Sequence, residues 1–472
     1  MTAILWLRDD LRLADHPALA AVAGEPLIAV YVVEERTGRR PLGGASRWWL
    51  HHALAALAEA LAARGGRLDI VRGDPRALLP DLARAAQARR VVWSRRYDVP
   101  GRACDEAIKA ELKAHGHAPE SFNAALLYEP WTIKTGAGGP FKVFTPFWKA
   151  ARLSGAPPAP LPAPARLEAA RWPKDAPPRV ALDALRLLPT KPDWAGGLRA
   201  AWTPGEAGAQ ARLNAFLDEG LNGYADGRDR PAAPHSSRLS PHLRFGDISP
   251  RQLFHAAAQA AEAGEATWRD VEKFQAELGW REFSYHLLFH WPELATQNFN
   301  PRFDAFPWTA PDEDALARWR AGRTGFPLID AGMRELWTTG FLHNRVRMVV
   351  ASFLIKNMLT DWRVGEDWFW DTLCDADPAS NPASWQWVAG SGADAAPYFR
   401  VFNPVLQGEK FDPAGEYLRR WVPELAALPD KWLHKPWTAP PTLRQGLDYP
   451  APMLDLGASR ERALAAFATI SP

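Results

Sequence analysis

Short apolar segments alternate with longer amphipathic segments through the first 115 residues of the chain. Strands that are apolar along their whole length and separated by helices indicate a parallel sheet covered on both faces. The alternation therefore predicts a doubly wound α/β domain over residues 1–130. The expected strands are 4–7, 27–33, 68–71 and 91–94, and the expected helices are 17–23, 46–64, 75–86 and 102–115.

A proline- and alanine-rich segment follows, and the pattern changes after it. Residues 154–197 resist regular structure, so we expect an interdomain linker over residues 131–203. Helical spacing alone recurs from residue 204 to residue 472, which predicts an all-helical second domain. The expected helices there are 207–220, 250–263, 268–289, 312–321, 330–338 and 344–361.

The composition limits the cellular compartments in which the protein can work and the kinds of partner that it can bind. The net charge is only +2, so a partner made of phosphates must meet a local basic face rather than an overall field. Cys104 and Cys374 are the only cysteines, which excludes a disulfide framework and fits a reducing compartment. The first residues are charged too early for a secretory signal, and no apolar run is long enough to span a bilayer. These features predict a soluble cytoplasmic protein without a membrane partner.

The stretch from Gly340 to Gly390 combines charged side chains with many tryptophans. Arg345 and Arg347 facing Asp375 and Asp377 would balance charge in a poorly solvated pocket. A surface ion-pair network is the commoner fate of such residues. The tryptophans favour a pocket for a planar redox cofactor or a nucleobase, because indole is readily oxidised and stacks on flat rings. They are Trp362, Trp368, Trp370, Trp385 and Trp387.

The segment HSSRLSPHLRFGDISPRQLF carries two Ser-Pro pairs, each expected to place proline at the first position of a helix. Ser236, Ser237 and the backbone of residues 238–240 would lie at a helix entrance, where an anion such as pyrophosphate can bind. Ordinary helix capping by serine explains the same residues equally well. Both explanations remain open from the residues alone.

Two familiar ligand patterns are missing from the sequence. The loop after the first expected strand reads RDDLRLADHP and lacks GxGxxG, so a standard dinucleotide site is not predicted there. His51 and His52 are adjacent and cannot share one helix face, and no other metal-ligand spacing occurs. We therefore expect no metal site.

Motifs spread along essentially the whole chain resemble those of the DNA photolyase/cryptochrome family. The similarity is greatest to the class I bacterial enzymes that repair cyclobutane pyrimidine dimers, and it implies an all-helical FAD-binding second domain. The motifs are Tyr224, SSRLSP (236–241), WREF (280–283), TGFPLIDAGMREL (324–336), HNRVRM (343–348), DWRVGE (361–366), WQW (385–387) and AAPYFRVFNPVLQGEKFDP (395–413).

The resemblance implies that FAD binds in a folded form within the helical domain. Asn381 would lie beside the flavin N5, where an amide can accept or donate a hydrogen bond. The implied phosphate-binding residues are Tyr224, Ser236, Ser237, Arg238, Leu239 and Ser240. The implied residues around the ribityl chain and the ring are Asn344, Arg347, Asp375, Asp377 and Asn381.

The resemblance also implies a reaction, the light-driven repair of DNA. Excited, fully reduced FAD would give one electron to a pyrimidine dimer flipped out of the helix and then recover it. Trp280 and Trp387 would stack on the dimer, contributing about 1–3 kcal/mol per base, and Glu277 would hydrogen-bond a pyrimidine edge. Core packing and a surface ion pair are the plain alternatives for these residues. Asn344, Arg345 and Met348 would complete the wall, and Arg228, Arg281 and Gln407 match DNA-contact positions.

Further implied features concern electron supply and light capture. Trp385, Trp362 and Trp308 resemble the tryptophan chain that carries electrons from the surface to oxidised flavin. The first domain of this family commonly holds an antenna chromophore, either methenyltetrahydrofolate or 8-hydroxy-deazaflavin. The loop YDVPGRACDE departs from the folate pattern, because Gly101 stands where an acidic ligand would fall. The identity of the antenna is left open, with Arg47, Asp98 and Arg102 as candidate ligands.

Three other functions are alternatives to the repair of cyclobutane dimers. A cryptochrome-like blue-light photoreceptor would share the flavin pocket, but Glu277, Trp280, Met348 and Trp387 occur together and little chain follows Ser459. A 6-4 photoproduct lyase would need a histidine where HNRVRM has asparagine. A purely structural helical protein leaves the tryptophans unexplained. The sequence thus favours a monomeric lyase that acts on damaged DNA.

Overall fold

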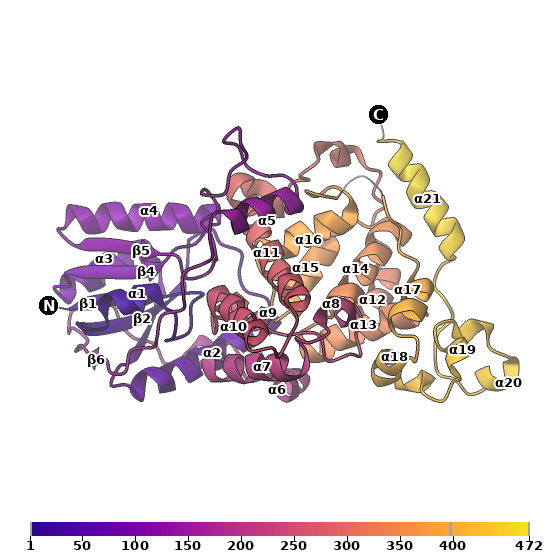
Figure 1. Cartoon of the computed structure of the whole chain (residues 1–472), viewed down its shortest axis with the longest axis horizontal. Coiled ribbons are helices and arrows are strands. Elements are labelled where there is room, and N and C mark those ends of the chain that lie inside the picture. Colours follow the sequence, from indigo (N-terminus) through magenta and orange to yellow (C-terminus); the bar gives the residue numbers. More distant parts are fainter. Residues whose placement is uncertain (1, 396–398, 471–472) are drawn as a thin grey trace.

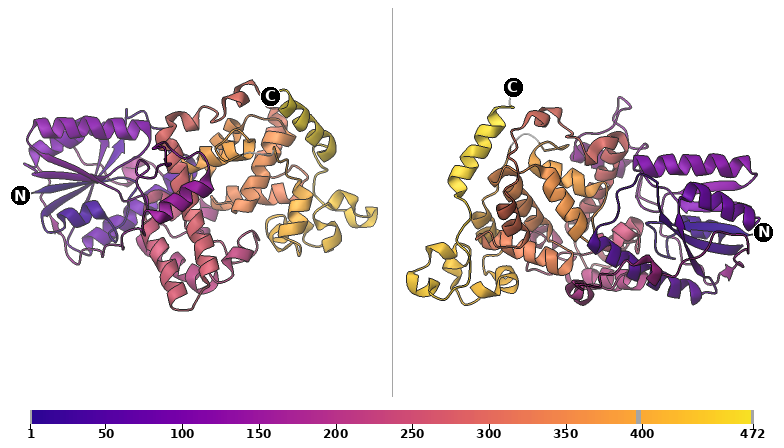
Figure 2. Two further views of the ribbon diagram at one scale, coloured as in Figure 1. Left: turned by 45° about the horizontal axis from the view of Figure 1, so that its top comes forward. Right: turned by 180° about the vertical axis from the view of Figure 1, so that it is seen from behind.

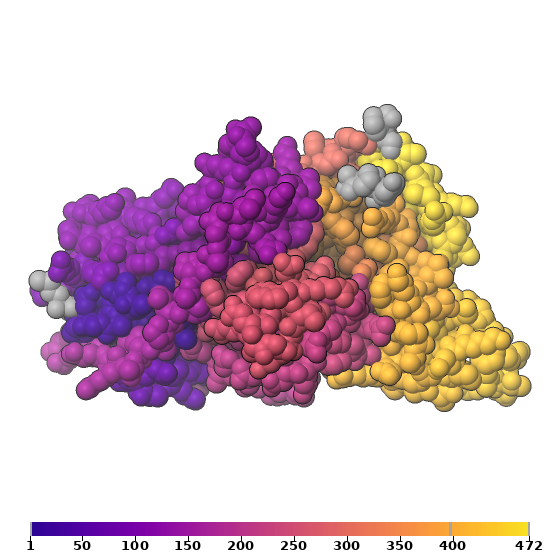
Figure 3. All heavy atoms as spheres, in the orientation of Figure 1, coloured from indigo at the N-terminus to yellow at the C-terminus, as the bar shows by residue number. Residues whose placement is uncertain are grey.

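The structure is a computed structural model that describes residues 2–395 and 399–470. A sheet with its covering helices forms one end of an elongated molecule, and helices form the rest (Figure 1). The space-filling view shows the N-terminal and C-terminal parts at opposite ends, with the middle of the chain between them (Figure 3). The predicted α/β domain and the helical second domain are both confirmed.

The sheet has the strand order β3-β2-β1-β4-β5, and every neighbouring pair is parallel. The chain reverses its direction of travel across the sheet after β3, so helices cover both faces (Figure 2). The strands are β1 (Ala3–Leu7), β2 (Pro26–Glu34), β3 (Leu68–Gly73), β4 (Arg90–Ser94) and β5 (Ala118–Phe122). The helices are α1 (Pro17–Val22), α2 (Gly44–Ala62), α3 (Pro75–Ala85) and α4 (Val99–Ala114).

Two strands escape the sequence analysis because they lack an apolar run. The edge strand β5 reads APESF and contains no fully buried residue. Strand β6 (Glu168–Ala169) lies inside the proline- and alanine-rich segment and pairs in parallel with β2. A further bridge joins Arg179 of that segment to Val71. The segment therefore adds to the sheet as it passes along it.

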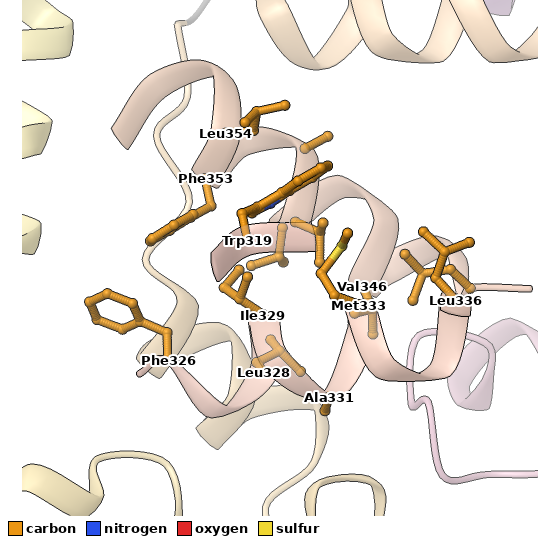
Figure 4. Close-up of a cluster of buried hydrophobic side chains, with 14 of the residues drawn as sticks. Trp319, Phe326, Leu328, Ile329, Ala331, Met333, Leu336, Val346, Phe353 and Leu354 are labelled. Atoms are coloured by element: carbon orange, nitrogen blue, oxygen red, sulfur yellow. The ribbon is translucent and has the colours of Figure 1, made fainter. Parts of the chain in front are cut away.

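The helical part surrounds a large cluster of buried side chains from α12, α13, α14 and the turn that follows (Figure 4). The helices are α5 (Phe144–Leu153), α6 (Gly196–Ala201), α7 (Glu206–Glu219), α8 (Tyr224–Gly227), α9 (Ser240–Phe245), α10 (Pro250–Glu262), α11 (Trp268–His290), α12 (Glu313–Arg320), α13 (Pro327–Thr339), α14 (Asn344–Ser352), α15 (Trp362–Thr372), α16 (Ser380–Ala389), α17 (Pro404–Phe411), α18 (Glu416–Trp421), α19 (Asp430–Leu433), α20 (Pro441–Arg444) and α21 (Leu456–Ala468). No helix among the described residues combines the length and the apolar character that crossing a bilayer requires.

The expected central helix over residues 344–361 is divided in the structure. Helix α14 passes into a π-helical turn, Phe353–Asn357, and the chain then leaves the helix. Leu359 has a left-handed backbone (φ 53°), and its carbonyl accepts a hydrogen bond of 2.9 Å from the N–H of Thr309. Helical spacing in the sequence could not reveal this break, because it is stabilised by a distant loop. A new helix, α15, begins at Trp362.

Buried contacts hold the α/β part and the helical part together. Asp247, which precedes α10, accepts hydrogen bonds from Trp49 Nε1 (3.1 Å) and from the N–H of Gly205 (2.9 Å). Arg12 donates to the carbonyl oxygen of Gly246 over 3.0 Å. These polar contacts lie between two hydrophobic cores, so they help to hold the helical part in a fixed position against the α/β part.

Candidate functional site

Arg347 on α14 and Asp375 in the turn after α15 form the ion pair that the sequence analysis expected. Arg347 Nη2 lies 2.8 Å from Asp375 Oδ2, and the same oxygen accepts a hydrogen bond of 2.6 Å from Ser240 Oγ. Arg345 does not join them, because it pairs with Asp229 over 2.6 Å. The expected arrangement of two arginines facing two carboxylates is therefore only half right.

The SSRLSP segment brings further polar groups beside this ion pair. Ser240 is the first residue of α9 rather than its cap, since Leu239 occupies the capping position and is buried. Arg238 has a left-handed backbone (φ 53°), and its guanidinium lies over the rings of Trp202 and Phe341. Within the described part of the chain, Arg238 Nε and Asp375 Oδ1 are buried without a hydrogen-bond partner. Buried unpartnered donors and acceptors of this kind indicate a polar ligand.

Tyr224 and Asp377, two further predicted residues, lie on α8 and in the turn before α16. Tyr224 on α8 packs edge-on against Phe216 and Phe274, and burial raises the pKa of its phenol well above the usual value. Asp377 accepts a hydrogen bond of 2.7 Å from the phenol of Tyr285. Its other oxygen accepts backbone hydrogen bonds at the start of α16. Asp377 therefore fixes the orientation of α16.

Asn381 on α16 is held by the carboxylate of Glu366 on α15. Its Nδ2 donates to Glu366 Oε1 over 2.7 Å and to the carbonyl oxygen of Glu366 over 3.2 Å. Both partners are acceptors, so the amide nitrogen must face them and the amide oxygen Oδ1 must face the other way. Arg40 from the α/β part binds the same carboxylate.

Trp280 on α11 and Trp387 on α16 line one pocket with a volume of about 150 Å³. Phe144 stacks on Trp280 with ring centroids 3.8 Å apart and an angle of 11° between the planes. The two indoles are predicted by the sequence motifs, whereas the ring of Phe144 is not. The pocket wall is therefore a rigid aromatic stack rather than a single tryptophan.

Asp394 connects the two aromatic walls of the pocket. Its carbonyl oxygen accepts a hydrogen bond of 3.2 Å from Trp387 Nε1, and its carboxylate lies 3.4 Å from the N–H of Phe144. Asp394 has a left-handed backbone (φ 59°), which is the conformation that asparagine and aspartate tolerate best among residues with side chains. Burial raises the pKa of its carboxyl group.

Lys356 also lines the pocket and was not predicted. It lies in the π-helical turn, donates to the carbonyl oxygen of Arg400 and faces the ring of Phe399, while burial lowers its pKa to about 7. Arg400 lines the same pocket. A single lysine inside the apolar run SFLIKNML was the signal that could have revealed Lys356.

Charged residues form a chain beside the polar region. Arg228 pairs with Glu277, and Arg345 pairs with Asp229, whose carboxylate lies 4.0 Å from Arg228. Glu277 thus has the ion pair that was its plain alternative. The two remaining predicted wall residues lie on α14, where Asn344 is exposed and Met348 is half-buried.

The three tryptophans predicted to carry electrons lie on neighbouring elements. Trp385 packs against α15 at Gly365, where an added methyl group would lie 2.1 Å from the indole. Trp362 begins the same helix and is fully buried, with Nε1 donating to Asn298 over 2.9 Å. Trp308 is half-buried, and the next residue, Thr309, hydrogen-bonds to Leu359 just before α15. Trp385 and Trp362 are thus buried, and Trp308 is partly exposed.

Other predicted residues lie elsewhere. Arg281 donates to the carbonyl oxygen of Ala125 over 2.6 Å and packs over Tyr285, which places it between α11 and the α/β part instead of in solvent. Gln407 on α17 is half-buried, and its Oε1 is among the described buried atoms without a partner. Asp98 binds Arg39, and Arg102 faces Phe289.

A larger cavity of about 300 Å³ lies between α2, α6, α13 and α15. Arg47 lines it together with Trp194 and Trp337, whose exposed fractions are 37% and 56%. Trp337 stacks on Trp368 with ring centroids 5.9 Å apart. Trp370 donates to the carbonyl oxygen of Pro41. Trp368 and Trp370 therefore make their contacts near this cavity and not in the polar region around Asp375.

These features define a class of protein: a parallel-sheet domain joined to a helical domain that holds hydroxyl, guanidinium, carboxylate and amide groups around one buried region. Comparison with known proteins refines that class. Residues 3–165 match the family model described as DNA photolyase, and residues 274–469 match the model described as the FAD binding domain of DNA photolyase.

Known relatives match along the whole chain. A deoxyribodipyrimidine photo-lyase of Agrobacterium fabrum is 52% identical, covering 99% of this chain and 98% of the relative. Cryptochrome-1 of Arabidopsis thaliana is 39% identical, covering 98% and 69% respectively. A crystal structure described as a bacterial class III photolyase from Agrobacterium tumefaciens is 51% identical, has a TM-score of 0.94 and covers 99% of this chain and 97% of its own.

The chain belongs to the DNA photolyase/cryptochrome family. The similar bacterial structure is of class III, so the expected class I assignment is not supported. The residues present suit FAD. The serines and Arg238 offer donors for phosphates, Asp375 Oδ1 offers a free acceptor for ribityl hydroxyls, and Asn381 presents an amide oxygen. Residues 396–398 of the closing motif lie outside the described residues.

Proposed function

We propose that the protein repairs cyclobutane pyrimidine dimers in DNA with blue light, as a deoxyribodipyrimidine photo-lyase. FAD, when bound in its reduced form and excited, supplies an electron to the dimer and takes it back. The protein must then hold a flipped-out dimer close to the flavin, exclude water and keep the flavin reduced.

One observation carries this proposal: helix α16 bears the residues proposed for flavin binding, for electron supply and for stacking on the dimer. Asn381 faces the proposed flavin ring, Trp385 begins the proposed electron path, and Trp387 forms one wall of the aromatic pocket. Residues on one rigid helix keep fixed distances from one another, and short fixed distances favour electron transfer between held groups. A helix that combines these groups supports a donor and an acceptor bound side by side.

The aromatic pocket suits a pyrimidine dimer. Trp280 and Trp387 offer stacking surfaces that are worth about 1–3 kcal/mol per base in other single-strand complexes. Extrusion of a damaged pair costs a few kcal/mol and less than extrusion of an intact pair. Stacking can therefore offset the cost of flipping. Asn344, Met348 and Glu277 remain proposed members of the wall.

The charged chain beside the pocket suits a DNA backbone. Arg228 and Arg345 are paired with Glu277 and Asp229, and a phosphate group would compete for both guanidinium groups. Phosphate binding would then release Glu277 to hydrogen-bond a pyrimidine edge. The proposed DNA-binding set is Arg228, Arg345, Asn344, Glu277, Trp280 and Gln407, and it excludes Arg281.

A blue-light photoreceptor is the second candidate, supported by the likeness to Cryptochrome-1 of Arabidopsis thaliana. The indole-lined pocket favours repair, because a photoreceptor has no need to stack an extruded base pair. We place the chain with the class III photolyases on the basis of the similar structure. We further propose a monomer acting in the cytoplasm, consistent with two buried free cysteines.

The deciding experiment illuminates the reduced, FAD-loaded protein with dimer-containing DNA in the absence of oxygen. Restored thymine absorbance is expected for the natural protein, and Trp387→Ala is expected to reduce repair through weaker dimer binding. Trp268→Ala is the matched control, because Trp268 is an exposed indole at the far end of α11. Fully reduced protein that repairs nothing would favour the photoreceptor.

The larger cavity is our proposed site for a second, light-harvesting chromophore. Trp194 and Trp337 offer exposed indole faces, and Arg47 offers a cation for a carboxylate, so the cavity suits a planar anionic pigment such as a folate. Asp98 and Arg102, the other candidates, are engaged outside it. Trp337→Ala should remove the pigment's absorption band and leave the FAD spectrum unchanged; retention of the band would exclude this cavity.

A further inference from the structure

The segment between β2 and α2 is attached to helix α15 by a series of contacts. Trp370 Nε1 donates to the carbonyl oxygen of Pro41, and the N–H of Gly44 donates to Asp371 Oδ1, each over 2.8 Å. Gly43 lies so close to α15 that a Cβ atom there would be 2.2 Å from the carbonyl oxygen of Trp370. The α/β part therefore reaches the helix that bears Glu366 through a tightly fitted loop.

Arg40 in this loop donates hydrogen bonds to both carboxylate oxygens of Glu366. Its Nη1 lies 3.0 Å from Oε1 and 2.8 Å from Oε2, and its guanidinium stacks over Trp370 at 4.4 Å. Arg40 also contacts Asp367. The side chain of Glu366 is only 4% exposed, whereas that of Arg40 is 36% exposed, so the carboxylate lies largely out of water, where a charge needs a partner.

The same carboxylate fixes the amide of Asn381. Ionised Glu366 offers only acceptors, so Asn381 Nδ2 must face it and Oδ1 must face away. A protonated Glu366 carries an O–H donor and would permit the opposite amide orientation. The charge on Glu366 therefore decides whether Asn381 presents an acceptor or a donor to whatever lies in front of it.

We propose that Arg40 is a positioning residue for the flavin: by keeping Glu366 ionised, it makes Asn381 present its carbonyl oxygen to the flavin N5. This inference rests on the proposed flavin site. Reduced flavin carries an N–H at N5, for which the carbonyl oxygen is the matching partner. The α/β domain would thus favour the reduced cofactor through one ion pair, in addition to any part it has in light capture.

The electrostatics of Glu366 support this relation. Burial raises the pKa of its carboxyl group, Arg40 lowers it, Asp367 raises it, and the hydrogen bond from Asn381 lowers it. Loss of Arg40 would remove the main opposing charge and raise the pKa further. A higher pKa for Glu366 would place more of the protonated form at a given pH, because the cation that favours the ionised form is gone.

The test compares Arg40→Ala with Arg39→Ala in the FAD-loaded protein. Arg39 is the matched control, because its partners Asp98 and Asp9 both lie in the α/β part. The readout is the ratio of reduced to oxidised flavin in equilibrium with a reference dye, measured from pH 5 to pH 9. Arg40→Ala should lower the ratio about fivefold, the value of one typical hydrogen bond, and should shift its pH profile upward. Arg39→Ala should match the natural protein.

A second variant separates this proposal from instability and from failure of the proposed function. Glu366→Gln removes the charge directly, and adding Arg40→Ala to it should change the ratio no further. If Arg40→Ala does not fold, Glu366→Gln must still lower the ratio, or the proposal is wrong. Identical ratios in Arg40→Ala and Arg39→Ala would overturn it even with repair intact. If Arg40→Ala lowers the ratio as expected but the natural protein repairs no dimers, only the proposed function is contradicted.

Discussion

Individual side chains decide the shape of the aromatic pocket. The sequence motifs identified Trp280 and Trp387 because both residues match positions in the family's motifs that have a known role. They did not identify Phe144 or Asp394, which act only through their neighbours. Arg345 was paired with the wrong carboxylate for the same reason: its true partner, Asp229, lies far away in sequence. Contacts between distant residues are the part of the site that residue types alone cannot supply.

Asp394 offers a test of the pocket at the scale of one residue. Asp394→Ala should weaken the binding of dimer-containing DNA several-fold, because Phe144 loses an acceptor and the strained backbone loses a residue suited to it. Asp394→Asn keeps both properties and should bind nearly as the natural protein does. Affinities measured in darkness check this, and equal binding by the alanine and asparagine variants would contradict it.

Glu282 offers a second test, through the pH dependence of stability. Its buried carboxylate accepts hydrogen bonds from the N–H groups of Leu127 and Tyr128, and burial raises its pKa to about 7. The folded state therefore holds the proton more tightly than the unfolded state, so the ionised form costs stability above pH 7 and the cost disappears as pH falls toward the unfolded pKa.

Glu282→Gln keeps an acceptor for both N–H groups and removes the charge. The free energy of unfolding should rise by about 1–3 kcal/mol at pH 8 and should equal that of the natural protein near pH 4.5. Urea unfolding at the two pH values measures the difference. A gain that is the same at both would show that proton binding by Glu282 is not its cause.

At the scale of elements, the alternation of apolar strands and helices predicted four of the five main strands, because burial on both faces requires apolar residues. The edge strand β5 and the two-residue β6 needed no such run and were missed. The central helix was predicted too long, because the π-helical turn and left-handed Leu359 depend on packing against other segments. Domain limits of 1–130, 131–203 and 204–472 remain our proposal.

The crossing of α15 and α16 gives a prediction for these elements. A methyl group on Gly365 would meet Trp385 at 2.1 Å and Leu354 at 2.6 Å, so Gly365→Ala must push the two helices apart. We expect a loss of about 1–3 kcal/mol in stability and slower photoreduction of bound flavin. Gly24→Ala is the control, because nothing lies within 4 Å of its added methyl group. Unchanged photoreduction in Gly365→Ala would remove Trp385 from the proposed path.

At the scale of the whole molecule, a net charge of +2 is too small to draw DNA to the protein from all sides. Affinity must come from a local surface, and we place that surface around Arg228 and Arg345. Sequence composition correctly excluded a broadly basic protein, but it could not say where the useful cations lie. The fold shows where Arg228 and Arg345 lie, and their role as those cations is our proposal.

The salt dependence of DNA binding tests that location. The logarithm of the binding constant for dimer-containing DNA should fall linearly with the logarithm of salt concentration, and Arg345→Ala should make that slope shallower by about 1. Arg76→Ala is the control, since Arg76 is an exposed arginine paired with Asp74 before α3 in the α/β part. A slope equally affected by both variants would mean that the DNA approaches another face.

The proline- and alanine-rich segment has a consequence for attempts to divide the molecule. Because β6 pairs with β2 and Arg179 bridges to Val71, this segment is hydrogen-bonded to the sheet at two places. A protease that cuts this segment would leave two fragments that remain bound to each other through strand pairing and shared hydrophobic cores. Such halves should elute together from a sizing column, and separately expressed halves should reassemble on mixing.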